Sequence, residues 1–425
     1  MYTELASPGD DELSRGWTLI LGSILGIGVG VISLPAAAVA FFMPALQAEF
    51  GWSRTTLSLA STIVTCAIVA TSPIVGWLAD RISALAIISF SLSALAAGFL
   101  ALSTLGADVR FYLAGFGIMA VLASGSSVVP YARLISANFV RRRGAALGMA
   151  MTGNGLAGVL LPLFLVPHTA LQGWRSGFVL LAGLVLVVVP LVVVLLWRSR
   201  APARASVSAN DTGGGMEFLQ AIRTRTFVLL MSCFGLVMLG VMGLQIHFVS
   251  FLTDSGYSAS TIGLFASIGG ATAIVSRILT GWLADRYFAP RVAASMIAAA
   301  SLLMAALAWR GGEWALLGTL AGGLAIGSEI DMIGYLTARY FGMRAYGRIY
   351  SLLYSACLAG SSLSILAYGL AVDISGTYDQ AIIVGSVLLA VSALMLLTLP
   401  PYLSIEYRPV FADECDRPDA QRTLA

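Results

Sequence analysis

Five ionisable side chains lie inside long apolar stretches of the sequence, where a charged group is costly unless it has a partner or faces a water-filled cavity. They are Arg133, His247, Arg277, Glu329 and Asp331. An arginine can hold a carboxylate through two parallel hydrogen bonds, and carboxyl groups and histidines can carry protons. These residue types therefore suggest that an anion is bound, and a proton moved, within a membrane.

Arg277 is the strongest candidate for binding an anion. It precedes Asp285 by eight residues, so on a helix it lies about 12 Å deeper in the membrane than Asp285. This position is near the middle of the bilayer, and a guanidinium there has the geometry to hold a substrate carboxylate. The alternative is a structural ion pair with Glu329 or Asp331.

Glu329 and Asp331 are the candidates for proton coupling. They are two positions apart, so on a helix they point about 160° away from each other and cannot line the same cavity. The face that holds Asp331 is the more polar one, which favours Asp331 toward the transport pathway and Glu329 against a neighbouring helix. Either could be the proton site, and the alternative is a fixed pairing with an arginine.

Four more side chains are candidates for contacts with the substrate: Tyr131, Asn154, Gln245 and His247. The first two could form neutral hydrogen bonds on the side of the substrate opposite Arg277, together with other hydroxyl groups nearby. Each could equally bond a neighbouring helix, and a lone histidine on an apolar helix can simply be a packing residue.

The elements that must position these residues are membrane-spanning helices. The 425 residues are 58% hydrophobic and only 11% charged, whereas a soluble domain is about 25% charged. Apolar stretches of the length needed to cross a bilayer follow one another from Gly16 to Pro400. They are apolar on all sides instead of alternating with period two, which excludes a β-barrel.

Short polar connectors divide the chain into twelve predicted spans. The spans are 17–46, 55–79, 82–105, 110–137, 144–167, 175–198, 224–253, 259–285, 288–310, 313–338, 345–372 and 378–400. The predicted fold is an all-α membrane protein with two six-helix halves, residues 1–198 and 224–402. A cytoplasmic linker (199–223) joins the halves, and a cytoplasmic tail (403–425) follows.

The distribution of arginine predicts the orientation, because positive charge is retained on the cytoplasmic side. All 24 basic residues are arginines. With both termini in the cytoplasm, eighteen of them fall on the inner side, four on the outer side and two within spans. Both termini are therefore predicted to be cytoplasmic.

An internal repeat indicates that the two halves arose by duplication. The hexamer GWLADR at residues 76–81, at the end of the second span, recurs at 281–286, at the end of the eighth. A weaker repeat relates residues 125–144 to 327–346, with Phe139 matching Phe341. The halves are therefore expected to be pseudo-symmetric.

The repeated hexamer also predicts a gate between the halves. Its glycine allows two helices to approach closely, and its aspartate can sit at the N-terminus of a neighbouring helix. Arg133, eight residues before Arg141, is expected to pair with Asp80, although it could instead attract an anion. The predicted gating residues are Gly76, Asp80, Arg81, Gly281, Asp285, Arg286 and Arg133. A solvated turn is the alternative for the hexamer.

The two GWLADR hexamers resemble the loop signature of the major facilitator superfamily, although Ile82-Ser83-Ala84 replaces the glycine and basic residues that usually follow. The resemblance covers the whole chain, including the six-plus-six layout. It implies substrate binding between the halves near the membrane middle and a cytoplasmic latch formed by the hexamers.

A narrower resemblance points to the monocarboxylate porter and oxalate:formate antiporter branch. It is carried by four motifs in order: RGW at 15–17, EFGWSR at 49–54, FVRRRG at 139–144 and the segment 369–378. The branch carries small carboxylates with a proton or by exchange. This chain lacks the lysine that many members use, and it has Ala273 where animal members have an aspartate before the arginine matched by Arg277.

The predicted function is secondary active transport of a small, monocarboxylate-like organic anion by alternating access, with proton symport as the favoured mode. The alternatives are a proton-antiport exporter of amphipathic or drug-like compounds and an anion exchanger. No enzyme activity, cofactor, metal or nucleic-acid partner is expected. The protein is predicted to be a monomer in a plasma membrane, specifically a bacterial inner membrane, with lipid and protons as its other partners.

Overall fold

A computed structural model describes residues 10–199 and 215–402 of the chain. Within these ranges the structure consists of helices and turns, with one isolated β-bridge between Gly215 and Gly342. Most of the predicted linker, residues 200–214, and the predicted tail, 403–425, lie outside the described residues.

The first half contains seven α-helices. They are α1 (Asp10–Gly28), α2 (Ser33–Phe50), α3 (Arg54–Arg81), α4 (Ala84–Ser103), α5 (Val109–Ala123), α6 (Val128–Asn138) and α7 (Arg143–Arg198). The second half contains α10 (Arg225–Asp254), α11 (Ala259–Arg286), α12 (Ala289–Arg310), α13 (Ala315–Phe341), α14 (Tyr346–Ser375) and α15 (Asp379–Leu397).

The described residues contain ten stretches that are long and apolar enough to cross a membrane. Two of these stretches are long enough to contain two membrane spans each. The stretch Arg143–Arg198 has 56 residues and is interrupted at Gly173, whose φ of 81° is not helical. The stretch Ala289–Phe341 has 53 residues and contains a 3₁₀ turn at Gly311–Trp314. Ten stretches with two divisions give the twelve predicted spans.

Two predicted spans are broken in the middle, which the sequence analysis did not foresee. The first span is interrupted between α1 and α2, and the fourth between α5 and α6, where a short 3₁₀ turn (Ser124–Ser126) intervenes. The backbone N–H of Val31 in one break donates to Oγ of Ser126 in the other, at 3.1 Å. A break inside a membrane requires such a partner, because no lipid group can satisfy the freed backbone. Pro35 and Pro130, just after the two breaks, were the signal in the sequence.

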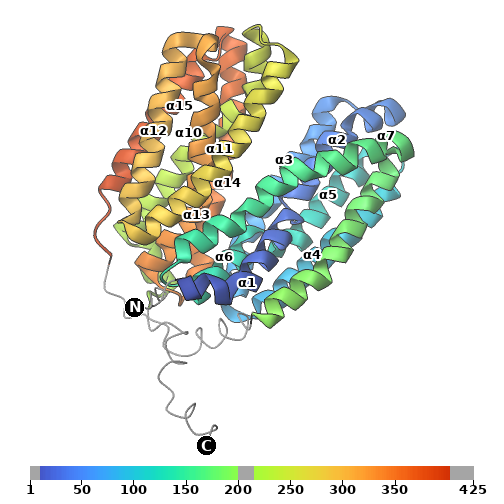
Figure 1. Cartoon of the computed structure of the whole chain (residues 1–425). Coiled ribbons are helices and arrows are strands. Elements are labelled where there is room, and N and C mark those ends of the chain that lie inside the picture. The colour runs from blue at the N-terminus through green and yellow to red at the C-terminus, as the bar shows by residue number, and fades with distance from the viewer. Residues whose placement is uncertain (1–9, 200–214, 403–425) are drawn as a thin grey trace, which may run out of the picture.

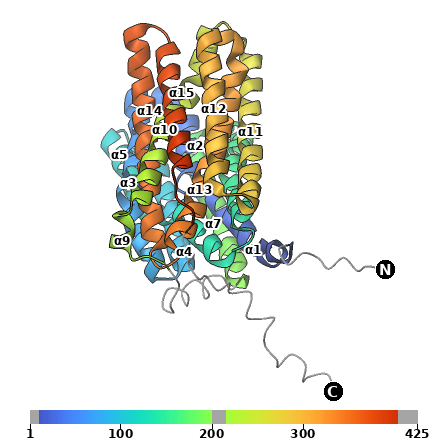
Figure 2. The same ribbon diagram turned by 90° about the vertical axis from the view of Figure 1, so that its left-hand side faces the viewer.

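The two halves form separate bundles that meet at one end and diverge toward the other (Figure 1). They meet where α3 and α11 end and where α7 and α14 begin, and we call this the latch end. Viewed from the side, the helices of the second half run next to one another along the long axis of the molecule (Figure 2).

The end of the predicted linker belongs structurally to the second half. Residues Phe218–Ile222 form the short helix α9, and the N–H of Met216 donates to the carbonyl of Phe341 at 2.9 Å. Glu217 pairs with Arg344 at 2.7 Å, beside the start of α14. The sequence boundary at residue 223 is therefore later than the point at which the chain joins the second bundle.

Candidate functional site

The repeated sequence gives two copies of one structural element. Helices α3 and α11 have 28 residues each and end with the arginine of the hexamer. Each begins after a left-handed glycine, Gly51 with φ 68° and Gly256 with φ 82°. In each, the N-cap serine, Ser53 or Ser258, accepts a hydrogen bond from the N–H three residues later. The duplication therefore extends over the whole helix.

Asp80, in the first hexamer, connects the two halves at the latch end. Its carboxylate accepts hydrogen bonds from the N–H groups of Gly347 (2.8 Å) and Arg348 (3.2 Å), in the first turn of α14. Nε of Arg133 and Nε of Arg348 lie 3.1 and 3.3 Å from its oxygens. The side chain is 4% exposed. A carboxylate at a helix N-terminus is stabilised by the helix dipole and the free N–H groups.

Asp285, in the second hexamer, makes the corresponding connection in the other direction. Its two oxygens accept hydrogen bonds from the N–H groups of Gly144 (2.7 Å) and Ala145 (2.9 Å), in the first turn of α7. Backbones approach closely at both connections, because a Cβ added at Gly76 would overlap the carbonyl of Gly347, and one added at Gly281 that of Gly144.

The two hexamer arginines do not reach across between the halves. The guanidinium of Arg81 lies over the ring of Trp77, with 4.3 Å from Cζ to the ring centroid, and that of Arg286 lies over Trp282 at 3.7 Å. Each arginine thus covers a tryptophan one turn earlier in its own helix. Both arginines therefore lie at the edge of the predicted gate, on their own helices.

Arg277 lies at the contact between the halves, farther from the latch end than Asp285. Its Nε is 3.8 Å from Oδ2 of Asp331 on α13, and Nη2 donates to the carbonyl of Ile326 at 3.4 Å. Its Nη1 donates to the carbonyl of Met151 on α7, in the other half, at 2.5 Å. The residue is 8% exposed. The structure therefore shows the ion pair with Asp331 that the sequence left open as an alternative.

Asp331 and Glu329 face opposite ways from α13. Asp331, 1% exposed, faces Arg277 and lies against Gly148 of α7. Glu329 is fully buried beside Cys357 of α14. Neither of its oxygens has a hydrogen-bond partner among the described residues. Of the two carboxyls, only Asp331 shares a site with a cation here.

The neutral candidates of the first half are not brought together around Arg277. Tyr131 is completely buried, and its hydroxyl lies against Gly26 of α1 without a hydrogen-bond partner among the described residues. Asn154 accepts a hydrogen bond from Ser33 beside the break between α1 and α2. In this conformation Asn154 supports the broken helix.

Gln245 and His247 lie on different sides of α10. The side-chain oxygen of Gln245 faces Gly322 on α13. The half-buried His247 has its Nε2 3.3 Å from the carbonyl of Ile365 on α14, and its ring centroid is 6.0 Å from that of Tyr378. Their contacts in the described part of the chain do not include Arg277.

A row of buried tyrosines was missed by the sequence analysis. Tyr346, Tyr350 and Tyr354 stack along α14, with ring centroids 5.7 and 6.1 Å apart. The hydroxyl of Tyr346 donates to the carbonyl of Gly334 at 3.2 Å and accepts from Ser136 of the first half at 3.1 Å. Spacing of i, i+4 and i+8 was the available signal, since it places all three on one helix face.

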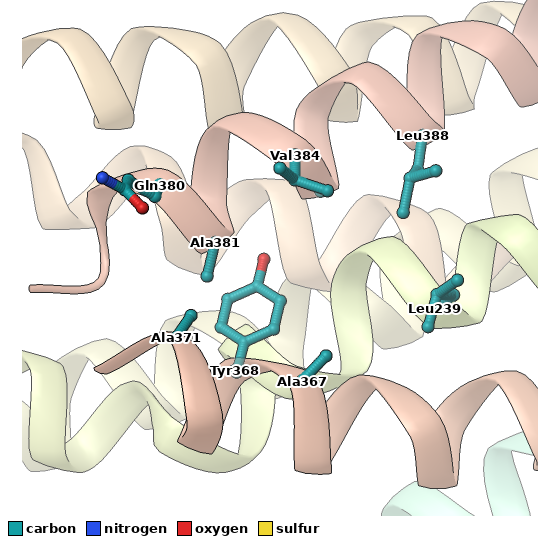
Figure 3. Close-up of a pocket in the computed structure, with 9 residues that line it drawn as sticks. Leu239, Ala367, Tyr368, Ala371, Gln380, Ala381, Val384 and Leu388 are labelled. Atoms are coloured by element: carbon teal, nitrogen blue, oxygen red, sulfur yellow. The ribbon is translucent and has the colours of Figure 1, made fainter. Parts of the chain in front are cut away.

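An apolar pocket lies elsewhere, between α10, α14 and α15 (Figure 3). Its volume is about 280 Å³, and it is lined by alanines, leucines, Val384, Tyr368 and Gln380. The hydroxyl of Tyr368 is already bonded to the carbonyl of Gly240, at 3.0 Å. This pocket contains none of the candidate substrate residues, so the charged contact between the halves remains the candidate site.

This arrangement defines a membrane transporter of two six-helix halves. The chain belongs to the Major Facilitator Superfamily, whose family model matches residues 25–365. Among solved structures, the fucose:proton symporter FucP of E. coli is similar with a TM-score of 0.69 at 14% identity, over 91% of this chain and 98% of that one. The proton:xylose symporter XylE has a TM-score of 0.71 at 13% identity, over 92% and 96%. Both confirm the predicted fold class.

Sequence relatives confirm the narrower resemblance. Monocarboxylate transporter 11 of Homo sapiens is 27% identical over 298 residues, which are 68% of this chain and 60% of the relative. Monocarboxylate transporter 13 of Bos taurus is 27% identical over 295 residues, 66% of each. The chain therefore spans about three fifths to two thirds of the length of these relatives.

Proposed function

We propose that this protein is a secondary active transporter that carries a small organic anion of the monocarboxylate type together with a proton. The observation that carries the proposal is the buried pair of Arg277 and Asp331, 3.8 Å apart, at the contact between the two halves. The names of the relatives, monocarboxylate transporters 11 and 13, support the substrate class.

The charge of the pair favours symport. Before binding, Arg277 and Asp331 sum to zero. A carboxylate on Arg277 would leave a net negative charge in a buried site, which is strongly unfavourable at low dielectric. Protonation of Asp331 restores neutrality, so one anion and one proton would enter together. Exchange of one anion for another needs no proton, because the loaded site keeps the same charge.

The contacts of Asp80 and Asp285 with the helix N-termini would keep the site closed on one side. If both termini are cytoplasmic, as the arginines predict, the latch end faces the cytoplasm and the halves are closed there. The structure then corresponds to the outward-facing state of an alternating-access cycle, and Asp80 and Asp285 must leave their helix N-termini for the inner side to open. In this proposal the protein works as a monomer in a plasma membrane.

Binding measurements test the substrate class. We expect lactate or pyruvate to raise the melting temperature of the purified protein, because a ligand that binds only the folded state stabilises it. Proteoliposomes with an inward pH gradient should accumulate the same anion. If lipophilic cations stabilise the protein and carboxylates do not, the exporter alternative replaces this proposal. Exchange without accumulation would indicate an anion exchanger.

A further inference from the structure

Two contact lines join the halves beyond the latch carboxylates, and they differ in chemistry. Helix α11 of the second half runs along α7 of the first, and α3 of the first half runs along α14 of the second. We call these the α7/α11 seam and the α3/α14 seam. The repeat that aligns residues 76–81 with 281–286 aligns Ser72 on α3 with Arg277 on α11.

The α7/α11 seam is fastened by a charge. Nη1 of Arg277 donates to the carbonyl of Met151 at 2.5 Å, so a guanidinium of one half is bonded to the backbone of the other. One turn earlier on α7, a Cβ added at Gly148 would lie 2.7 Å from the backbone oxygen of Arg277 and 3.7 Å from Oδ2 of Asp331. The glycine therefore lets α7 press directly onto the ion pair.

The α3/α14 seam has only neutral contacts at the same level. The hydroxyl of Ser355 donates to the carbonyl of Val69 at 3.2 Å. The hydroxyl of Ser72, at the position related to Arg277, is buried without a hydrogen-bond partner among the described residues. A hydrogen bond from a charged donor is about twice as strong as a neutral one.

We infer that the α7 backbone at Gly148 and Met151 is the part of the first half that detects whether the site is occupied. In the structure Arg277 is bonded to Met151 and holds the α7/α11 seam closed. An anion that binds Arg277 draws the guanidinium away from Met151 and loosens this seam, whereas the described contacts of the α3/α14 seam at this depth are neutral. The release step rests on the proposed function; the bond from Arg277 to Met151 does not.

In this way one side chain, Arg277, would serve both binding and gating. A ligand shifts a conformational equilibrium only through different contacts in the two states. The bond to Met151 is present in this structure, in which the latch end is closed, and a substrate anion would compete for the same N–H group. The anion therefore favours the state in which the seam is open.

The test measures opening of the latch end by electron spin resonance distances. The full chain in lipid nanodiscs, with its four cysteines replaced, would carry spin labels at Ile82→Cys and Tyr287→Cys. These two exposed positions follow the hexamers of the two halves. Gly148→Ala is the variant, because its methyl group must displace α7 from α11. Gly155→Ala is the matched control on the same helix, since a Cβ there meets Ile274 at an ordinary 3.6 Å.

Without any anion, Gly148→Ala should raise the ratio of long to short distances about tenfold, as expected for loss of one charge-assisted hydrogen bond. Gly155→Ala should leave it unchanged. A double variant, Arg277→Met with Asp331→Asn, should act like Gly148→Ala without leaving a buried charge unpaired, and it carries the test if Gly148→Ala does not fold. If Gly148→Ala and the double variant both show the same distances between the spin labels as the parent protein, the inference is overturned.

Lactate separates the inference from the proposed function. In the parent protein it should shift distances in the same direction, and in the double variant it should change nothing. If both variants loosen the seam but lactate does not bind the parent, the proposed function fails and the fastening stands. If lactate binds the parent and neither variant nor ligand changes the distances, the inference fails and the proposed function stands.

Discussion

The two halves share a backbone plan but differ in the middle of the membrane. The repeats align Arg277 with Ser72, and Asp331 with Val129. The first half is thus neutral where the second half holds an ion pair at 3.8 Å. At the latch end the halves remain alike, with an aspartate of each on a helix N-terminus of the other. The repeats thus share the contact of an aspartate with a helix N-terminus, whereas the ion pair that the proposed function uses lies in the second half.

The first half has its own charged cluster, at the far end from the latch. Glu49 accepts hydrogen bonds from Nε1 of Trp174 (2.6 Å) and from Arg175 (2.7 Å), and Arg175 also donates to the carbonyl of Leu105 (3.2 Å). These bonds tie the end of α2 to the kink of α7 at Gly173 and to the loop that follows α4. The first half therefore has a charged cluster at its rim, and the second half has a charged pair deep in the contact between the halves.

The largest expected effect comes from removing the charge that only the second half has. Arg277→Ala should abolish carboxylate binding, and Arg277→Lys should retain part of it, because an ammonium keeps the charge but loses the two-pronged geometry. Each lost contact is worth about 1.5–3 kcal/mol, or at least tenfold in affinity. Calorimetric titration with lactate measures the affinity of each variant.

Ser72, the position of the first half that the repeat aligns with Arg277, provides the control. Ser72→Ala should bind lactate like the parent. Melting temperatures must be compared as well, because loss of Arg277 leaves Asp331 unpaired in the interior and destabilises the fold. A folded Arg277→Ala protein with parental affinity would contradict the proposed role of the second half.

The next effect concerns the proton. Asp331→Asn should abolish accumulation driven by a pH gradient, because the amide cannot bind a proton, while counterflow exchange of labelled lactate should persist. Uptake into proteoliposomes with and without a gradient measures both. Glu329→Gln distinguishes the two carboxyls of α13. If it, and not Asp331→Asn, loses accumulation, the proton site is Glu329.

Substitutions of Asp80 and Asp285 should show how far the two halves are equivalent at the latch end. Asp80→Asn and Asp285→Asn should both lower the transport rate and leave lactate affinity within about threefold, because neither residue touches the site. Asp80→Asn should have the larger effect, since Asp80 also bonds Arg133 and Arg348, and a bond to a charged group is worth about 1.5–3 kcal/mol. Equal transport rates for both variants and the parent would remove the gating role.

The smallest effect is expected at the rim of the first half. Glu49→Gln should lower the melting temperature slightly and leave binding unchanged, because Glu49 and Arg175 are both well exposed and exposed ion pairs contribute little. Asp254→Asn, at the related position of the second half, serves as the control and should not shift the melting temperature. A larger shift for Asp254→Asn would show that the second half has a rim contact of its own.

Composition and periodicity were sufficient to predict the class of fold and the positions of the charges on its helices. Twelve apolar stretches must become helices, because only helices satisfy their own backbone in lipid. The repeated hexamer required two equivalent connections, and the separation of Glu329 from Asp331 around a helix followed from helical geometry. Each of these conclusions depends on periodicity or composition, which are local properties of the chain.

Which groups meet follows from the packing of the helices in three dimensions. The bond from Arg277 to the carbonyl of Met151 joins residues 126 positions apart, and a backbone carbonyl leaves no trace in side-chain type. The two mid-span breaks stabilise each other, because the N–H of Val31 in one donates to the hydroxyl of Ser126 in the other. His247, Asn154 and Tyr131 had suitable chemistry but face other helices here. The bond from Arg277 to Met151 further depends on how the two halves pack against each other, which no local pattern in the sequence records.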